Sequence, residues 1–392
     1  MRYFLLILMP CLLAMACAAS RPFPLAEDPI DKNDEMRLWR QAEAEQAVLE
    51  GSGIIYEDQE LEDYLHQIAR KLQPLEIQKD FTFKLRIIKD PHLNAFAFPN
   101  GVIFIHTGLL TRVDNEAQLA AILAHEMAHC TKRHALRAYG GIKNHPRILL
   151  SLREAISGFG GLGDLLAVFG TPGCAAAVTG YSQIFETEAD MVGLQLMIKA
   201  GYEPNETLRL FEHLKHEAET ENLKEPFFFG TQRRLQRRID NCKTFLANLN
   251  QSKQQGAKNA EIFLEGIHKV ILLNAFLDLK AGRFNTALGG AQKYLTIRPN
   301  DARAYFLMGE IFRQNVGAGD RFKARVFYEK AISMDPSYPE PHKAIGLICF
   351  EEREWMLAKK HFESYLALSL QSGDRAYIQG YLQECHKKGA PS

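Results

Sequence analysis

The stretch LAHEMAH, residues 123–129, decides the fold of this chain. It lies among apolar helix formers that predict one helix over 115–138. Four residues advance an α-helix by slightly more than one turn, so His125 and His129 project from one face and can share a metal ion. Glu126 adjoins that face and can act as a general base toward water. The pattern predicts a zinc site held by His125 and His129, with Glu126 as the catalytic carboxylate.

A catalytic zinc site keeps three protein ligands and an open position, so a third ligand is required. A second helix, expected over 183–200, carries Glu186 and Asp190 one turn apart on the same face. Glu186 can supply the third ligand. Asp190 is placed to accept a hydrogen bond from a zinc-bound histidine and to fix its tautomer. The sequence therefore predicts one Zn²⁺ per chain.

Neighbouring polar residues are interpreted as structural. In a continuous helix, His134 turns well away from the face that carries His125. Cys130 also projects off that face and is interpreted as core, and Glu188 as solvent-facing or structural. The alternative for the motif is an amphipathic helix with two satisfied histidines, which the presence of Glu186 disfavours.

The residues before the motif predict two helices and a small sheet. The helices are expected over 31–50 and 59–72, a strand over 81–87, and a hairpin over 95–98 and 102–105. The fold class is therefore α+β over residues 31–250. The interval 140–180 is apolar and rich in glycine, and it predicts a covering loop with short helices rather than a membrane-dipping helix.

The N-terminus predicts export and a lipid anchor. Residues 1–17 have the apolar core of a signal peptide and a lipobox-like end at Cys17, the expected lipidation site. Cleavage near Ala16 or Ala18 without lipidation, or an uncleaved anchor, are the alternatives. Residues 18–30 contain three prolines and predict a tether. We expect a periplasmic lipoprotein anchored in the outer membrane of a bacterial envelope.

The C-terminal residues 261–392 repeat a helical pattern after a polar boundary at 248–260. An aromatic residue stands at the start of each second helix, and an alanine follows it closely. The pairs are Phe284 with Ala287 and Trp355 with Ala358, each three residues apart, and Phe322 with Ala324, two residues apart. The pattern resembles tetratricopeptide repeats, about three of them with a terminal helix ending near Lys388. A non-repeat helical bundle is the alternative. Such repeats offer a surface for peptides or partner proteins.

Composition excludes other classes. Lys+Arg and Asp+Glu balance at 47 each among 392 residues, so no net charge favours nucleic acid as a partner. The cysteines are scattered without a C-x-x-C pair, which disfavours a disulfide framework or a thiolate metal site.

With these motifs in place, the chain resembles the HtpX/BepA-type zinc metallopeptidases. This gluzincin family includes the CAAX prenyl proteases and the mitochondrial Oma-type peptidases. The resemblance covers about 31–240 and rests on Asn94-Ala95-Phe96-Ala97, Gly108-Leu109-Leu110, the H-E-x-x-H motif, and Tyr181-Ser182 ahead of Glu186-x-x-Ala189-Asp190. It implies a zincin-like fold, Glu186 as a zinc ligand, and an edge strand from Asn94 to Ala97 that pairs with an extended substrate.

One segment departs from the family pattern. Family members carry a Thr/Ser-His-Pro segment before a helix containing Arg-Ile, and here Gln232 stands where that histidine is expected. A glutamine amide can donate a hydrogen bond to a developing oxyanion but cannot ligate zinc comparably. Gln232 is therefore a candidate for that role, and Tyr181 is a second one.

The expected function is a zinc-dependent endopeptidase that acts on unfolded or misassembled envelope proteins. Its repeats would recruit the substrate or an envelope protein partner, and the BepA-like architecture implies quality control of outer-membrane proteins. The alternative is a chaperone-like repeat scaffold with a weak or latent protease site. An aminopeptidase and a transmembrane prenyl protease are disfavoured, since the sequence offers neither an amine-anchoring motif nor a credible 20-residue span.

Overall fold

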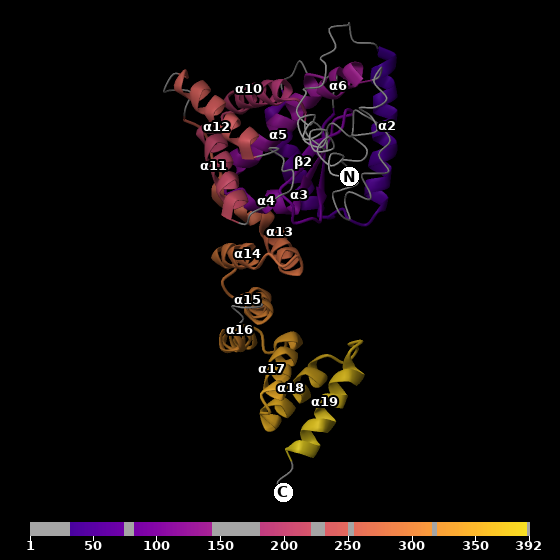
Figure 1. Ribbon diagram of the computed structural model, residues 1–392, viewed down its shortest axis with the longest axis vertical. Helices are drawn as coiled ribbons and strands as arrows, with labels where there is room; N and C mark the ends of the chain where they lie inside the picture. The colour runs from indigo at the N-terminus through magenta and orange to yellow at the C-terminus, as the bar shows by residue number, and fades with distance from the viewer. Residues whose placement is uncertain are drawn as a thin grey trace, which may run out of the picture. The chain divides into compact units, whose positions relative to one another are not determined.

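The computed structural model describes residues 32–73, 82–142, 181–220, 232–249, 255–315 and 320–389 (Figure 1). The predicted signal peptide with Cys17, the tether at 18–30 and nearly all of the 140–180 interval lie outside the described residues. The chain divides into two compact units. The first holds Met1–Ile88, Leu93–Ile105 and Asn115–Asn259, and the second holds Lys89–His92, His106–Asp114 and Ala260–Ser392. No helix of the described ranges has the length and apolarity to cross a bilayer.

The first unit begins with two helices, α2 (Lys32–Gly51) and α3 (Gln59–Leu72). Helix α3 starts where the Asp58 side chain accepts a hydrogen bond from the Leu61 N–H, which satisfies one of the free donors of the first turn. Leucine and isoleucine at helical spacing form its buried face. Both helices match their predicted ranges within one or two residues.

The sheet has three strands, β1 (Lys84–Ile88), β2 (Ala95–Ala97) and β3 (Val102–His106), in the order β1-β3-β2. Strand β2 pairs antiparallel with β3, with Phe96 opposite Phe104. Gly101 turns the hairpin at a φ of 87°, which a residue with a Cβ rarely adopts. The small predicted sheet and its hairpin are confirmed.

Three phenylalanine rings on the hairpin form the core between the sheet and α2. Phe96, Phe98 and Phe104 lie with ring centroids 5.2–5.6 Å apart and pack with Ala42 and Leu49 of α2. Ring pairs at this spacing bury large apolar areas in a fixed geometry. The core therefore holds α2 against the face of the hairpin.

The central helix is α5 (Glu116–Thr131), and it is shorter than predicted. Arg133 adopts a left-handed φ of 52°, and a new helix, α6 (His134–Ile142), begins after it. The N–H groups of Lys132 and Arg133 donate to carbonyls of the last turn of α5, which closes that helix. The prediction of one continuous helix over 115–138 was wrong, because this left-handed residue redirects the chain.

The second long helix, α10 (Gln183–Lys199), crosses α5 at close range. At Gly193 an added Cβ would lie 3.1 Å from the His125 backbone nitrogen, so a larger residue would require the two helices to move apart by a few tenths of an ångström. The helix starts at its Ser182 cap and ends before Gly201, which has a φ of 79°. Helices α11 (Asn205–Thr220) and α12 (Gln232–Ala247) complete the helices described in the first unit.

The second unit is all helical. Its helices are α4 (Thr107–Arg112), α13 (Ala260–Lys280), α14 (Phe284–Ile297), α15 (Ala302–Gln314), α16 (Arg321–Met334), α17 (Pro339–Glu351), α18 (Trp355–Leu368) and α19 (Arg375–Lys388). Those after α4 pack in consecutive pairs, α13 with α14, α15 with α16, and α17 with α18. Gly309 lies against the ring of Tyr328, and Gly346 against that of Phe362, where a Cβ would lie within 2.4–2.6 Å of the ring. The predicted helical C-terminal region is confirmed.

Helix α4 belongs to the second unit, although the prediction placed it within 31–250. All six of its residues are buried. Thr107 donates to Asn274 on α13 at 2.8 Å, and Arg112 pairs with Asp278 at 3.0 Å. The second unit therefore draws together stretches of sequence that lie far apart.

Candidate metal centre and active site

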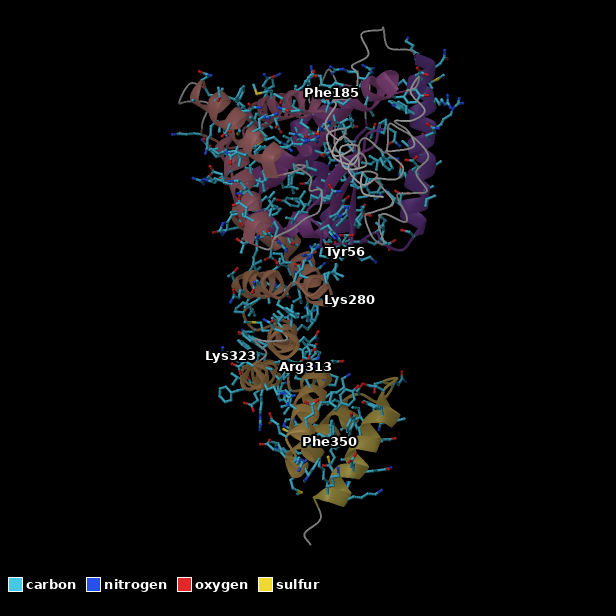
Figure 2. The ribbon with its side chains drawn as sticks, in the orientation of Figure 1. Tyr56, Phe185, Lys280, Arg313, Lys323 and Phe350 are labelled. Carbon is cyan, nitrogen blue, oxygen red and sulfur yellow. The ribbon has the colours of Figure 1, made fainter. Side chains whose placement is uncertain are left out.

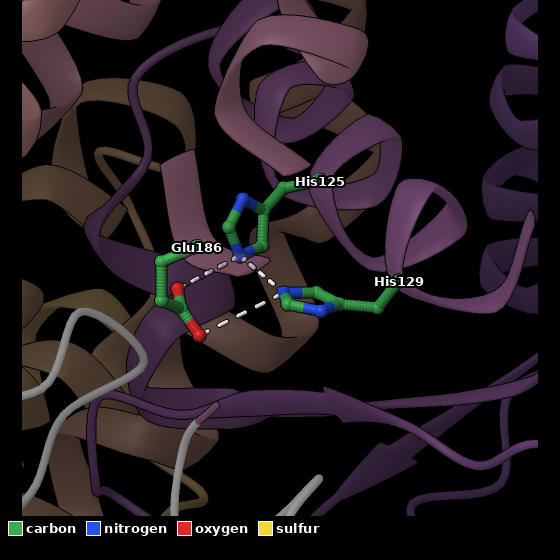
Figure 3. Close-up of side chains that lie close together, drawn as sticks. All are labelled: His125, His129 and Glu186. Atoms are coloured by element: carbon green, nitrogen blue, oxygen red, sulfur yellow. Dashed lines mark hydrogen bonds and ion pairs between the residues drawn. The ribbon is translucent and has the colours of Figure 1, made fainter. Parts of the chain in front are cut away.

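Three side chains from two helices converge in the first unit (Figure 3). The Nε2 atoms of His125 and His129 lie 2.9 Å apart on α5. Glu186 of α10 places one carboxylate oxygen 3.4 Å from Nε2 of His125 and the other 3.8 Å from Nε2 of His129. One ligand atom from each residue lies within 4.8 Å of the others. Two imidazoles and one carboxylate are the donors that a catalytic zinc ion takes.

His125 is held from behind by Asp190. Its Nδ1 lies 3.0 Å from Asp190 Oδ1 and 3.1 Å from Nη2 of Arg238. Arg238 only donates, and it binds both oxygens of Asp190 at 2.5–2.9 Å. Asp190 is therefore the acceptor for the Nδ1–H of His125, which leaves Nε2 to face the centre.

The electrostatics of this group are strongly coupled. Burial and the charge of Arg238 lower the pKa of His125, but hydrogen bonds to Asp190 and Glu186 outweigh them and raise it to about 9. Burial raises the pKa of Glu186, yet His125 and His129 outweigh burial and lower it to about 2. Burial and the adjacent His125 hold the pKa of His129 well below its usual range. The site therefore favours an ionised Glu186 beside positive charge.

Glu126 lies beside the three converging side chains and is buried, with 4% of its surface exposed. Burial and the charge of Glu186 raise the pKa of Glu126 to about 7, against the lowering effect of His125 and Arg238 and of a hydrogen bond from the backbone of Ala97. A carboxyl group with a pKa near neutrality can both take and return a proton at physiological pH. Glu126 thus has the properties of a general acid–base.

His129 has a polar partner of its own, which the sequence analysis missed. Its Nδ1 lies 2.8 Å from Nδ1 of His134, whose Nε2 lies 3.3 Å from Glu188. His134 had been interpreted as turned away from the ligand face, but the chain reversal at Arg133 returns it to His129. Burial lowers the pKa of His134 to about 4, although Glu188 opposes this. The sequence carries no glycine or proline there to signal the break.

Of the two oxyanion candidates, the structure describes the side chain of Tyr181 but not that of Gln232. The ring of Tyr181 stacks on His129, with centroids 4.3 Å apart and planes 18° from parallel. Its backbone N–H donates to Glu186 at 3.2 Å. Gln232 is the first residue of α12, but its side chain lies outside the described residues.

The expected substrate strand is β2, which has β3 as its one neighbour among the described strands. Ala95, Phe96 and Ala97 are 1–4% exposed, and Asn94 before them is half-buried. The contact of Ala97 with Glu126 places this strand beside the predicted general base. The strand therefore lies at an edge of the sheet and next to the site, with its side chains buried.

A small pocket lies beside His129 and Tyr181. Its walls are mainly apolar and include Leu38, Trp39, Phe98 and Leu136. The pocket joins His129 to the end of β2 at Ala97 and to Phe98.

Comparisons with known proteins agree with this geometry. Residues 56–246 match the model of peptidase family M48. The chain is 31% identical over 151 residues to the mitochondrial metalloendopeptidase OMA1 of Schizosaccharomyces pombe, covering 38% of this chain and 43% of that protein. It is 30% identical over 182 residues to the beta-barrel assembly-enhancing protease of Escherichia coli strain K12, covering 43% and 36%.

The matched segments span less than half the length of the fission-yeast and Escherichia coli proteins. The family match includes both helices that carry the converging side chains, since α5 and α10 lie inside 56–246. Residues 56–246 of this chain therefore form a metallopeptidase domain of family M48, homologous to the OMA1 and beta-barrel assembly-enhancing proteases.

Proposed function

We propose that this chain is a zinc-dependent endopeptidase that acts on unfolded or misassembled proteins of the bacterial cell envelope. The observation that carries the proposal is the convergence of His125, His129 and Glu186 next to the buried Glu126. Membership of the M48 domain in a peptidase family and the names of its relatives support the same reaction.

The residues present fit Zn²⁺. Two imidazole nitrogens and one carboxylate oxygen lie within 4.8 Å of one another, which is the donor set that a catalytic zinc site uses. His125 and His129 would hold the ion through Nε2, and Glu186 through its carboxylate. When bound, zinc supplies Lewis acidity that polarises a peptide carbonyl and makes water a better nucleophile.

The chain itself supplies proton transfer and orientation. Glu126 takes a proton from the attacking water and delivers it to the departing amine, because its pKa of about 7 permits both. Asp190 keeps the His125 proton on Nδ1, and Arg238 fixes Asp190 with two hydrogen bonds. These groups are buried, so they reorganise little during the reaction.

Substrate binding would use the edge of the sheet and the adjoining pocket. An extended peptide pairing with β2 gains main-chain hydrogen bonds that do not depend on its sequence. The apolar walls around Trp39, Phe98 and Leu136 favour contact with an apolar side chain if the pocket opens on binding. Such side chains are exposed in unfolded proteins and buried in folded ones, which favours misfolded substrates.

The helical pairs of the second unit are proposed to be tetratricopeptide repeats that recruit substrate or an envelope protein partner. Supporting this, paired helices of 13–14 residues follow one another, and Gly309 and Gly346 meet an aromatic ring at equivalent places. Repeats of this kind present extended surfaces for binding peptides.

The proposed location is the periplasmic face of the outer membrane, through a lipid on Cys17. The sequence of residues 1–17 and the relatives named as beta-barrel assembly-enhancing proteases support this location. Metabolic labelling with an alkyne fatty acid would test it. Label on the parent but not on a Cys17→Ala variant is expected, and label on both would contradict the anchor.

One observation favours a second candidate, the repeat scaffold with a latent protease site. His125, Glu126 and His129 are each 4% exposed, and the side chains of β2 are buried as well. A substrate needs access that these residues do not offer in this conformation. The second candidate predicts that biological activity survives when Glu126 is replaced.

Zinc content and casein cleavage by the purified mature protein test the proposal, with Glu126→Gln as the matched variant. We expect about one zinc per chain in both proteins and cleavage by the parent alone. Zinc in both without cleavage in either would support the latent site. Absence of zinc from the parent would refute the assignment of the three ligands.

A further inference from the structure

His134 and Glu188 continue a chain of polar contacts that begins at His129. Nδ1 of His129 is 2.8 Å from Nδ1 of His134, and Nε2 of His134 is 3.3 Å from Oε2 of Glu188. Arg137 donates to the same glutamate oxygen at 2.8 Å. His134 is fully buried, whereas the side chain of Glu188 is 32% exposed. The line of contacts therefore runs from the metal centre toward the surface.

The order of donors along this line follows from Glu188. An ionised carboxylate only accepts, so Nε2 of His134 carries the hydrogen that faces it. A neutral imidazole has one N–H, which makes Nδ1 of His134 an acceptor. The hydrogen between the two Nδ1 atoms then belongs to His129. With its proton on Nδ1, His129 presents the lone pair of Nε2 toward His125 and Glu186.

Ring packing holds both imidazoles in this arrangement. Phe185, labelled in Figure 2, stacks on His134 with centroids 4.5 Å apart and planes 13° from parallel. Tyr181 stacks on His129 on its side of the pair. The guanidinium of Arg137 lies 4.4 Å from the centre of the Phe185 ring while it binds Glu188. The rings cannot turn without displacing these neighbours.

We propose that His134 and Glu188 are positioning residues that fix the tautomer and the orientation of His129 for zinc binding. The inference rests on the proposed function, and it assigns positioning partners to His129 in addition to those of His125. Asp190 orients His125 by direct contact, whereas Glu188 orients His129 through one intervening imidazole. Partners that orient ligand histidines typically contribute about 10- to 100-fold to metal affinity.

Three substitutions in the full mature chain separate this role from general packing. His134→Phe keeps a ring against Phe185 but leaves the Nδ1–H of His129 without an acceptor. His134→Asn restores an acceptor oxygen near that position. Glu188→Gln can accept through its amide oxygen or donate through its NH2 group, so residue 188 no longer enforces one order of donors. Glu212→Gln, on an exposed ion pair with Lys243, is the control.

Zinc affinity is measured by competition with a chromophoric chelator, so no cleavage is needed. We expect about 10- to 100-fold weaker binding for His134→Phe and Glu188→Gln, partial recovery for His134→Asn, and no change for Glu212→Gln. Affinities within twofold of the parent for both His134→Phe and Glu188→Gln would overturn the inference.

The tautomer of His129 is measured separately on the zinc-free protein, by nitrogen-15 NMR of labelled histidines. A proton on Nδ1 in the parent and a mixture of Nδ1 and Nε2 tautomers in Glu188→Gln is the expected result, and a proton on Nε2 in the parent would overturn the inference. This measurement needs neither zinc nor cleavage. It therefore stands even if the parent binds no zinc, which would refute the proposed function alone.

Discussion

The close crossing of α5 and α10 makes Gly193→Ala a sharp test of how the site is built. The added Cβ would lie 3.1 Å from the His125 nitrogen and 3.3 Å from the Ala124 carbonyl carbon. Both are backbone atoms of α5, so no side chain can rotate away. To reach an ordinary contact of about 3.5 Å, α10 has to move outward by roughly 0.4 Å.

That movement displaces Glu186 and Asp190, which α10 carries, relative to His125. Metal–ligand distances tolerate only about 0.2 Å, so we expect zinc affinity to fall about tenfold or more. Stability changes less. Replacing helical glycine by alanine gains about 1 kcal/mol, whereas overpacking costs about 1–3 kcal/mol, which leaves a net destabilisation of about 0–2 kcal/mol.

Chelator competition measures the zinc affinity, and thermal unfolding of the zinc-free protein measures stability. Gly380→Ala on α19 is the matched control, because nothing lies within 4 Å of a Cβ added there. It should raise stability by up to about 1 kcal/mol and leave zinc affinity unchanged. Undiminished zinc affinity in Gly193→Ala would refute the view that this crossing sets the ligand geometry.

Three further results are expected. Burial raises the pKa of Asp301, but hydrogen bonds from Arg303 outweigh burial and lower the pKa to about 2. This carboxylate therefore stabilises the second unit above about pH 4, and the stabilisation is lost as the pH falls toward 2. Urea unfolding followed from pH 5 to pH 2 should show a loss on the order of 1 kcal/mol that Asp301→Asn lacks, and equal pH dependence in both proteins would contradict this. Arg112→Ala leaves the fully buried Asp278 without its charge partner and should cost about 3–5 kcal/mol in a urea titration at neutral pH, whereas a change under 1 kcal/mol would be inconsistent with a buried pair. Removing zinc with EDTA should lower the melting temperature, because only the folded chain assembles the three ligands, and an unchanged melting temperature would argue against a bound ion.

Much of the site follows from the sequence because its geometry is local to two helices. Within α5, the spacing of His125 and His129 determines that they share a face, and the same holds for Glu186 and Asp190 on α10. Two helices that each present a polar face of this kind have few ways to bury it except against one another. The sequence alone therefore identified these side chains as a candidate metal centre.

The partners of His129 could not be anticipated in this way. Their position depends on the left-handed Arg133, and arginine gives no sign of that conformation. The turn is supported by an ion pair with Glu35 at 2.7 Å, a contact between residues far apart in the chain. Helical periodicity assumes an unbroken helix, so it wrongly predicted that His134 turns away from the face that carries His125 and His129.

The burial of α4 in the second unit has a practical consequence for anyone who divides this protein. The polar stretch at 248–260 looks like a place to cut, yet a fragment ending there would keep Thr107 and Arg112 and lose Asn274 and Asp278. In that fragment, α4 would expose its apolar side chains and the Arg112 guanidinium to solvent, which favours self-association. A stable truncation has to retain at least α13 and α14, since Lys293 of α14 also donates to the carbonyls of Thr111 and Val113.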